Sequence, residues 1–166
     1  MAATLHVVAG KAGAGKTTLA REIARTAPAL FICEDEWMSR LAGRIESLSQ
    51  YLEAAERIRN VIAPLAIDVL SLGTSVVFDF AGNTAADRQW VRSIFMRAAA
   101  DHLLHYLAVD DETCKARVRQ RNADQPAGVF FGVVSEEQVD EVNQYFTPPA
   151  TEEGFEIEVY SLGRHS

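Results

Sequence analysis

Short apolar runs alternate along the chain with longer stretches of helical periodicity. The apolar runs have the length of strands, and we place strands at Thr4–Ala9, Ala29–Cys33, Ser75–Asp79, Leu103–Val109 and Phe155–Tyr160. Strands that alternate with helices in this way are typical of a parallel sheet with helices packed on both faces. The pattern therefore predicts a three-layer α/β fold.

The helical stretches are predicted at Thr17–Thr26, Ser47–Leu72, Ala85–Ala100, Glu112–Arg121 and Glu136–Phe146. Pro64 lies inside the second helix, and because proline lacks a backbone donor we expect it to kink or split that helix. Ser135 precedes the last helix and is a candidate N-cap. The segment Asn122–Gly132 has no apolar periodicity and has the length of a functional loop such as a lid.

One motif stands out directly after the first predicted strand. Residues 10–17 read G-K-A-G-A-G-K-T and match the phosphate-binding pattern G-x-x-x-x-G-K-[ST] at every position. Glycines let the backbone turn its N–H groups inward, and the next helix adds its free N–H groups. The residues predicted to bind the phosphates of a nucleotide are Gly10, Ala12, Gly13, Ala14, Gly15, Lys16, Thr17 and Thr18. Lys16 would contact the β- and γ-phosphates, and the Thr17 hydroxyl would hold Mg²⁺.

Acidic residues follow three of the predicted strands, at the sheet edge where ligands of open parallel sheets bind. Asp35 is a candidate general base for an attacking hydroxyl, and a solvated helix start is its alternative. Asp79 is a candidate Mg²⁺ ligand that also faces substrate, with a helix cap or an ion pair as the alternative. Asp110 and Asp111 are better explained by the next helix, which Asp111 is expected to cap.

Arginines recur at helical spacing. Arg117 and Arg121 lie four residues apart and share a helix face, so they fit a cationic clamp over a transferring phosphoryl group. A solvated stripe paired with Glu112 is the alternative. Arg40 and Arg88 each belong to a further pair of this spacing and are candidates for substrate binding. Trp37, Tyr51, Phe80 and Trp90 would line an acceptor site or pack in the core.

Composition narrows the class of protein. The chain has 166 residues, enough for one domain with a substantial core, and its net charge of −7 argues against a nucleic-acid partner. Cys33 and Cys114 lack the spacing of a metal site, and we expect both to be reduced thiols in or near the core. We find neither a signal segment nor a long apolar run and expect a cytoplasmic protein, monomer or homodimer, that does not bind membranes.

The chain resembles the AAA-33-type small P-loop kinases, which are related to zeta toxins, chloramphenicol phosphotransferase and gluconate kinase. The resemblance covers nearly the whole chain and rests on the phosphate-binding loop and on the segments Asp35–Leu41, Gly73–Phe80, Leu104–Asn122 and Phe146–Pro149. It implies a five-stranded parallel sheet in the order 2-3-1-4-5, ATP with Mg²⁺ as the donor, and transfer of the γ-phosphoryl to a hydroxyl of a small molecule.

The same resemblance implies roles for single residues. Asp35 matches the general base of the zeta toxin and chloramphenicol kinase branch, Arg117 and Arg121 match the lid arginines of gluconate kinases, and Arg88 matches a substrate contact. The segment Asn122–Gly132 lacks the histidine and lysine of gluconate kinases, which argues against gluconate as the acceptor.

Two other classes of function stay open. A P-loop ATPase or switch would use water as the acceptor, although the chain has no guanine-reading N-K-x-D segment. A nucleotide-binding regulatory module would lack the base or the lid arginines, whereas this chain has Asp35, Arg117 and Arg121.

Overall fold

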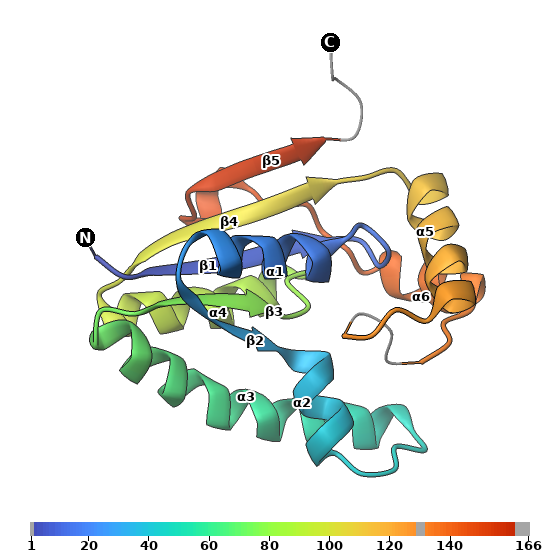
Figure 1. Ribbon diagram of the computed structural model, residues 1–166, viewed down its shortest axis with the longest axis horizontal. Coiled ribbons are helices and arrows are strands. Elements are labelled where there is room, and N and C mark those ends of the chain that lie inside the picture. Colours follow the sequence, from blue (N-terminus) through green and yellow to red (C-terminus); the bar gives the residue numbers. More distant parts are fainter. Residues whose placement is uncertain (1, 129–131, 162–166) are drawn as a thin grey trace.

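Five parallel strands form one sheet in the computed structural model, which describes residues 2–128 and 132–161 (Figure 1). The strands are β1 (Thr4–Gly10), β2 (Ala29–Cys33), β3 (Ser75–Asp79), β4 (Asp101–Ala108) and β5 (Ile157–Ser161). Their order across the sheet is β2-β3-β1-β4-β5. All five predicted strands are present, and the predicted fold class and strand order are confirmed.

Helices connect the strands and cover both faces of the sheet. They are α1 (Lys16–Thr26), α2 (Glu34–Leu41), α3 (Leu48–Ser71), α4 (Ala85–Ala98), α5 (Asp111–Asp124) and α6 (Glu136–Asn143), followed by the short 3-10 helix η1 (Thr151–Glu153). Helix α1 packs on one face against Val8 and Val77. Helices α3 and α4 pack on the other face, where Leu5, Val7 and Phe78 are fully buried.

Helix α3 continues through Pro64, so of the two expected effects, a kink or a split, the split does not occur. A proline in a helix interior costs about 3 kcal/mol. The buried face of α3 offsets that cost, because Ile58, Ile62, Ala66 and Leu70 all pack in the core and each large side chain contributes about 1.5–3 kcal/mol.

Two segments differ from the sequence prediction. Helix α2 was not predicted as an element, since its eight residues carry three acids in the first turn and only three large apolar side chains, those of Trp37, Met38 and Leu41. Helix α5 continues to Asp124, so residues 122–124 of the predicted lid loop are helical. Residues 129–131 of that loop lie outside the described part of the chain.

Candidate active site

The predicted phosphate-binding loop joins β1 to α1 at the carboxyl edge of the sheet (Figure 1). Gly13 and Gly15 have φ values of 86° and 100°, the left-handed region that glycine tolerates. A Cβ atom at Gly13 would lie 2.4 Å from the carbonyl oxygen of Cys114, so α5 packs directly against the loop. Helix α1 begins at Lys16 and directs its free N–H groups and positive dipole end toward the loop.

Lys16 lies folded against this loop. Its Nζ donates to the carbonyl oxygen of Gly10 at 2.6 Å and to that of Lys11 at 3.0 Å. Burial lowers the pKa of Lys16, while the carboxylates of Asp79 and Asp35 act in the opposite direction. The ammonium group is thus held beside the concave side of the loop, where a phosphate would replace the carbonyl oxygens as its partner.

The Thr17 hydroxyl donates to Oδ2 of Asp79 at 2.6 Å. Asp79 ends β3 and is 8% exposed, which brings a carboxylate from one strand to the first turn of α1. An adjacent hydroxyl and carboxylate beside a phosphate-binding loop are oxygen ligands of the kind that Mg²⁺ prefers. The residues present therefore fit the expected metal.

Asp35 lies beside Asp79 because β2 and β3 are neighbours and Cys33 is paired in register with Asp79. The pKa of Asp35 is raised by burial first, then by the carboxylates of Asp79 and Glu34. Lys16 and Arg121 act against this increase. A carboxylate with a raised pKa near two cations has the properties of a general base.

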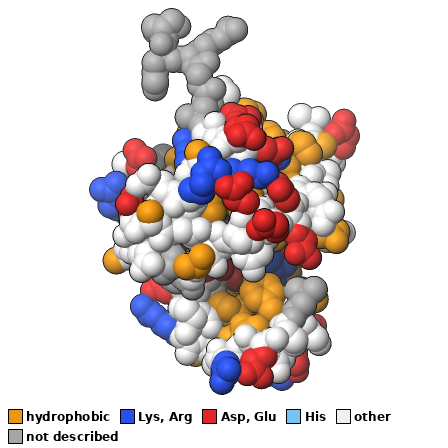
Figure 2. All heavy atoms as spheres, turned by 90° about the vertical axis from the view of Figure 1, so that its right-hand side faces the viewer, with side chains coloured by type: hydrophobic (Ala, Val, Ile, Leu, Met, Phe, Trp, Pro, Cys, Tyr) orange, Lys and Arg blue, Asp and Glu red, His pale blue; other side chains and the backbone are white. Residues whose placement is uncertain are grey.

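These groups line one cleft of about 800 Å³. Its wall includes the loop and the start of α1, Glu34, Asp35 and Tyr51 on one side, Asp79, Phe80 and Asn83 at the sheet edge, and Arg117 and Arg121 from α5. Figure 2 looks onto this edge of the molecule and shows a hollow between a larger upper part, rich in charged side chains, and a smaller lower part.

The arginines of α5 divide as their spacing predicts. Arg117 Nη1 donates to the carbonyl oxygen of Ala14 at 2.6 Å, and both Arg117 and Arg121 line the cleft. The Nε atom of Arg121 is buried without a hydrogen-bond partner in the described structure. Arg119 points elsewhere and pairs with Glu136. The alternative of a stripe paired with Glu112 is not seen, since neither Arg117 nor Arg121 pairs with Glu112 in the described structure.

The cap of α5 corrects a smaller prediction. Asp110, not Asp111, accepts a hydrogen bond from the backbone N–H of Thr113 at 2.8 Å. Asp111 is the first helical residue and pairs with Lys11 at 2.7 Å. The N-cap of α6 at Ser135 is confirmed, and Cys33 and Cys114 are buried free thiols as expected.

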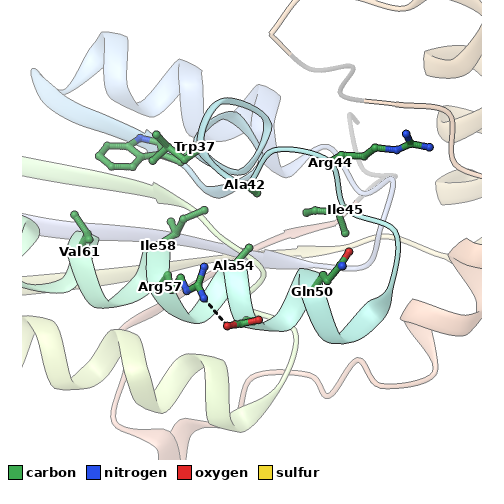
Figure 3. Close-up of a pocket in the computed structure, with 11 residues that line it drawn as sticks. Trp37, Ala42, Arg44, Ile45, Gln50, Ala54, Arg57, Ile58 and Val61 are labelled. Carbon is green, nitrogen blue, oxygen red and sulfur yellow. Dashed lines mark hydrogen bonds and ion pairs between the residues drawn. The ribbon is translucent and has the colours of Figure 1, made fainter.

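Three further predicted substrate contacts do not reach the cleft. Trp37 is two residues from Asp35, which places it on the opposite side of α2. It lines a separate hollow of about 380 Å³ between α2 and α3, together with Ile45 and Ile58 (Figure 3). Arg40 pairs with Glu36 at 2.7 Å and is largely exposed.

Arg88 is the clearest correction, because it is fully buried. It lies on the face of α4 that packs against the sheet, one turn before Val91. Its guanidinium binds Glu153 at 2.8 Å and the carbonyl oxygens of Gly82 and Thr147 at 3.0 and 2.9 Å. In this structure Arg88 therefore joins α4 to the segment before β5 and does not line the cleft.

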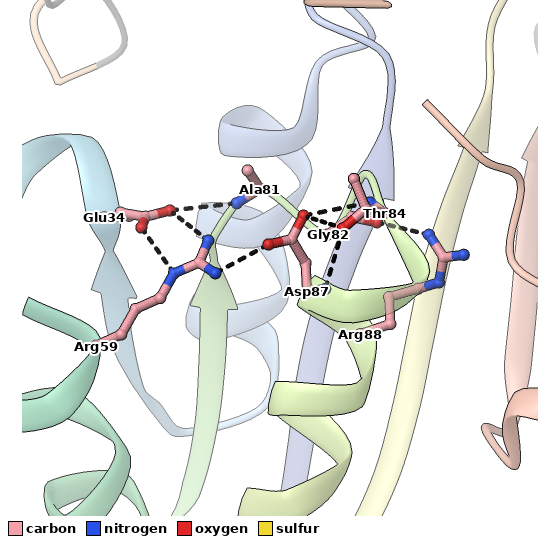
Figure 4. A network of polar contacts seen from close by, with 7 residues as sticks. All are labelled: Glu34, Arg59, Ala81, Gly82, Thr84, Asp87 and Arg88. Atoms are coloured by element: carbon pink, nitrogen blue, oxygen red, sulfur yellow. Dashed lines mark hydrogen bonds and ion pairs between the residues drawn. The ribbon is translucent and has the colours of Figure 1, made fainter. Parts of the chain in front are cut away.

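Two groups of residues at the site were missed by sequence reasoning. Arg59 of α3 bridges Glu34 and Asp87, with Nε 3.0 Å from Glu34 Oε1 and Nη1 2.9 Å from Asp87 Oδ1 (Figure 4). On the opposite side, Asn143 of α6 accepts a hydrogen bond from the backbone N–H of Ala12 at 2.8 Å. These contacts join residues 25 to 131 positions apart, and no local pattern signals them.

The fold and the loop together define a P-loop fold of the small-kinase type. The AAA_33 family model, described as an AAA domain, matches residues 5–149, and the chain belongs to this family. No curated protein sequence shows a significant match. In the described residues we find no helix that combines the length and the apolar character needed to cross a membrane.

Solved structures with the same fold share little sequence identity with the chain. A candidate kinase from Chloroflexus aurantiacus has a TM-score of 0.77 at 14% identity over 97% of this chain and 89% of that one. Kti12 from Chaetomium thermophilum, in complex with ADP-AlF3, has a TM-score of 0.72 at 15% identity over 95% and 89%. APS kinase CysC from Mycobacterium tuberculosis, in complex with AMPPNP and APS, has 0.62 at 17% over 98% and 90%.

Proposed function

We propose that the protein is an ATP-dependent phosphotransferase that transfers the γ-phosphoryl group of ATP to a hydroxyl of a small molecule. The observation that carries the proposal is the position of Asp35, a carboxylate of raised pKa in the same cleft as the phosphate-binding loop. The nucleotide complexes of the structural neighbours Kti12 and APS kinase support the donor half.

Each residue has a role in this reaction. The backbone of residues 12–18 and Lys16 bind the phosphates, and Arg117 and Arg121 stabilise the charge of the transferring group. The acceptor oxygen attacks the γ-phosphorus, the bond to the bridging oxygen breaks, and ADP leaves with the electron pair. Asp35 accepts the proton of the attacking hydroxyl. Mg²⁺ held by Thr17 and Asp79 would screen the phosphate charges.

The test is ADP release from MgATP over a panel of sugars, amino sugars, nucleosides and small alcohols. A kinase releases ADP slowly alone and faster with the right acceptor. If the rate of ADP release is the same with every acceptor and with none, the proposal is contradicted and the protein is a P-loop ATPase. The structural similarity to Kti12, solved with ADP-AlF3, makes this the main alternative. Nucleotide binding without any ADP release would indicate a regulatory module.

A further inference from the structure

Helix α2 contributes the carboxylates of Glu34 and Asp35 to the cleft wall, and no cation from α2 or α3 lines it in the described structure. Glu34 and Asp87 share a single guanidinium, that of Arg59 (Figure 4). Glu34 and Asp35 both line the cleft. Because two carboxylates share one cation, this group keeps a net negative charge, and burial strengthens the field that a ligand there would meet.

One oxygen of Glu34 lacks a close partner. Glu34 is 4% exposed, and its Oε1 accepts a hydrogen bond from Arg59 at 3.0 Å. Its Oε2 has two contacts at 3.5 Å, to Nη2 of Arg59 and to the backbone N–H of Ala81. Hydrogen bonds to a carboxylate are usually about 2.7–2.9 Å when the donor is charged. A buried carboxylate oxygen at the cleft with these long contacts fits a charged donor from a ligand.

The cations of the cleft belong to the phosphate end. Lys16 lies against the loop carbonyls, and Arg117 is bonded to Ala14 of the same loop. Arg121 stands one turn further along α5. A bound triphosphate would engage these three charges. Near the start of α2, Arg21 and Arg40 both approach Glu36 instead of the cleft.

Two aromatic rings lie in the same part of the cleft. Tyr51 and Phe80 line it together with Glu34 and Asp35. Burial first, and then the carboxylates of Glu34 and Asp35, raise the pKa of Tyr51 to about 12, so the two carboxylates contribute to the shift but do not dominate it. Aromatic faces attract organic cations, and this attraction is independent of the carboxylates.

We propose that the acceptor is an amino alcohol or amino sugar whose protonated amine binds Glu34 and the ring of Tyr51 while its hydroxyl faces Asp35. This inference rests on the proposed phosphotransferase function and adds the charge class of its substrate. The amine keeps its proton throughout, and the hydroxyl alone passes its proton to Asp35. An acceptor with a carboxylate or phosphate group would be repelled from the same wall.

Binding measurements compare cationic, neutral and anionic acceptors without requiring turnover. With the protein saturated by Mg²⁺ and AMPPNP, we expect glucosamine to bind more tightly than glucose and glucuronate to bind weakest. Ethanolamine, ethylene glycol and glycolate repeat the comparison on a smaller skeleton. The inference is overturned if the anionic member of either series binds as well as the cationic one, or if neither cationic probe binds.

Glu34→Gln keeps the shape of the wall and removes its charge. We expect the cationic probe to bind about tenfold more weakly to this variant, with the neutral probe changed less than about twofold. Glu36→Gln is the matched control, since Glu36 lies on the same helix and pairs with Arg40 outside the cleft. Equal effects of the two substitutions on the cationic probe contradict the inference.

A second measurement, on the wild type, tests the inference even if the Glu34→Gln variant does not fold. In the wild type, raising the salt concentration from about 0.05 M to 0.5 M should weaken binding of the cationic probe selectively, because screening lengths fall over this range. A salt response shared by the neutral probe overturns the inference.

The substrate class and the reaction can fail separately. If cationic probes bind but no ADP forms from ATP, the proposed phosphotransferase function is contradicted, and the proposed binding site for a protonated amine is still supported. If ADP release is stimulated by neutral or anionic acceptors and not by cationic ones, the function stands and the charge assignment fails.

Discussion

At the scale of single residues, burial gives neighbouring acids different chemistry. Glu34, Asp35 and Glu36 are consecutive, yet Glu34 pairs with Arg59, Asp35 faces the cleft near Lys16, and Glu36 pairs with Arg40 near the surface. The sequence could indicate that an acid at this strand end is important. It could not tell which of the three line the cleft, because that depends on the rotation of α2 against α3.

We expect Asp35→Asn to lower kcat by about 10²–10⁴ with little change in nucleotide affinity, as when a general base is lost and the donor site is kept. Asp79→Asn should instead weaken the dependence on Mg²⁺. Steady-state kinetics over a range of Mg²⁺ concentrations checks both, and exchanged phenotypes would show that the two assignments are reversed.

Asp35 should also determine how kcat/KM depends on pH. Burial and two neighbouring carboxylates raise the pKa of Asp35, and a base must be ionised to act. We therefore expect kcat/KM to rise with pH through that raised pKa and to level off above it, so that the acid limb lies above the usual aspartate value of about 3.9. A pH profile of Asp35→Asn should lack this limb, and a limb that persists would assign it to another group.

At the scale of elements, one face of α5 presents its cations to the phosphate-binding loop. Arg117 and Arg121 should act together, because both line the cleft from the same side of the helix. We expect each single alanine variant to lower kcat/KM and the double variant to cost less than the sum of the two. Arg119→Ala is the control, since Arg119 pairs with Glu136. A large loss for Arg119→Ala alone would contradict the assignment.

Helix α6 holds the loop from the other side through Asn143 and the N–H of Ala12. A net hydrogen bond contributes about 0.5–1.5 kcal/mol, so Asn143→Ala should weaken ADP binding about two- to tenfold by loosening the loop. Calorimetric titration measures this change, and Gln144→Ala, at the exposed next position, serves as the control. Unchanged ADP affinity in Asn143→Ala would show that the loop holds its shape without α6.

Element boundaries illustrate what the sequence could predict. The strands and the long helix were predicted because their apolar residues lie at regular spacing over many positions. Helix α2 is too short for an apolar spacing to repeat over many positions, and the last turn of α5 is mostly polar. Their positions follow from packing against α3 and α6.

At the scale of the whole molecule, the parallel sheet was predictable from the alternation of strands and helices, and its strand order from the resemblance to small P-loop kinases. The long-range polar pairs were not. Arg88 and Glu153 are 65 positions apart, and a single arginine on a helix looks the same whether it binds substrate or a buried carboxylate.

Arg88→Met should destabilise the fold by about 3–5 kcal/mol, because it leaves Glu153 and two carbonyl oxygens without their partner. Urea unfolding measures the loss. Arg92→Met is a matched control on the exposed side of α4 and should change stability by less than about 0.5 kcal/mol. A stable Arg88→Met protein with a raised KM for its acceptor would instead restore the substrate role.

The central claim is that phosphate moves from ATP to an organic hydroxyl, and the destination of the γ-phosphate tests it most directly. Phosphorus NMR of reactions with Mg²⁺, ATP and each acceptor of the panel should show a new phosphate-ester signal with at least one acceptor. Lys16→Ala should abolish that signal, because Lys16 contributes charge stabilisation at the phosphates. Inorganic phosphate as the sole product, formed at a rate that no acceptor changes, would contradict the account.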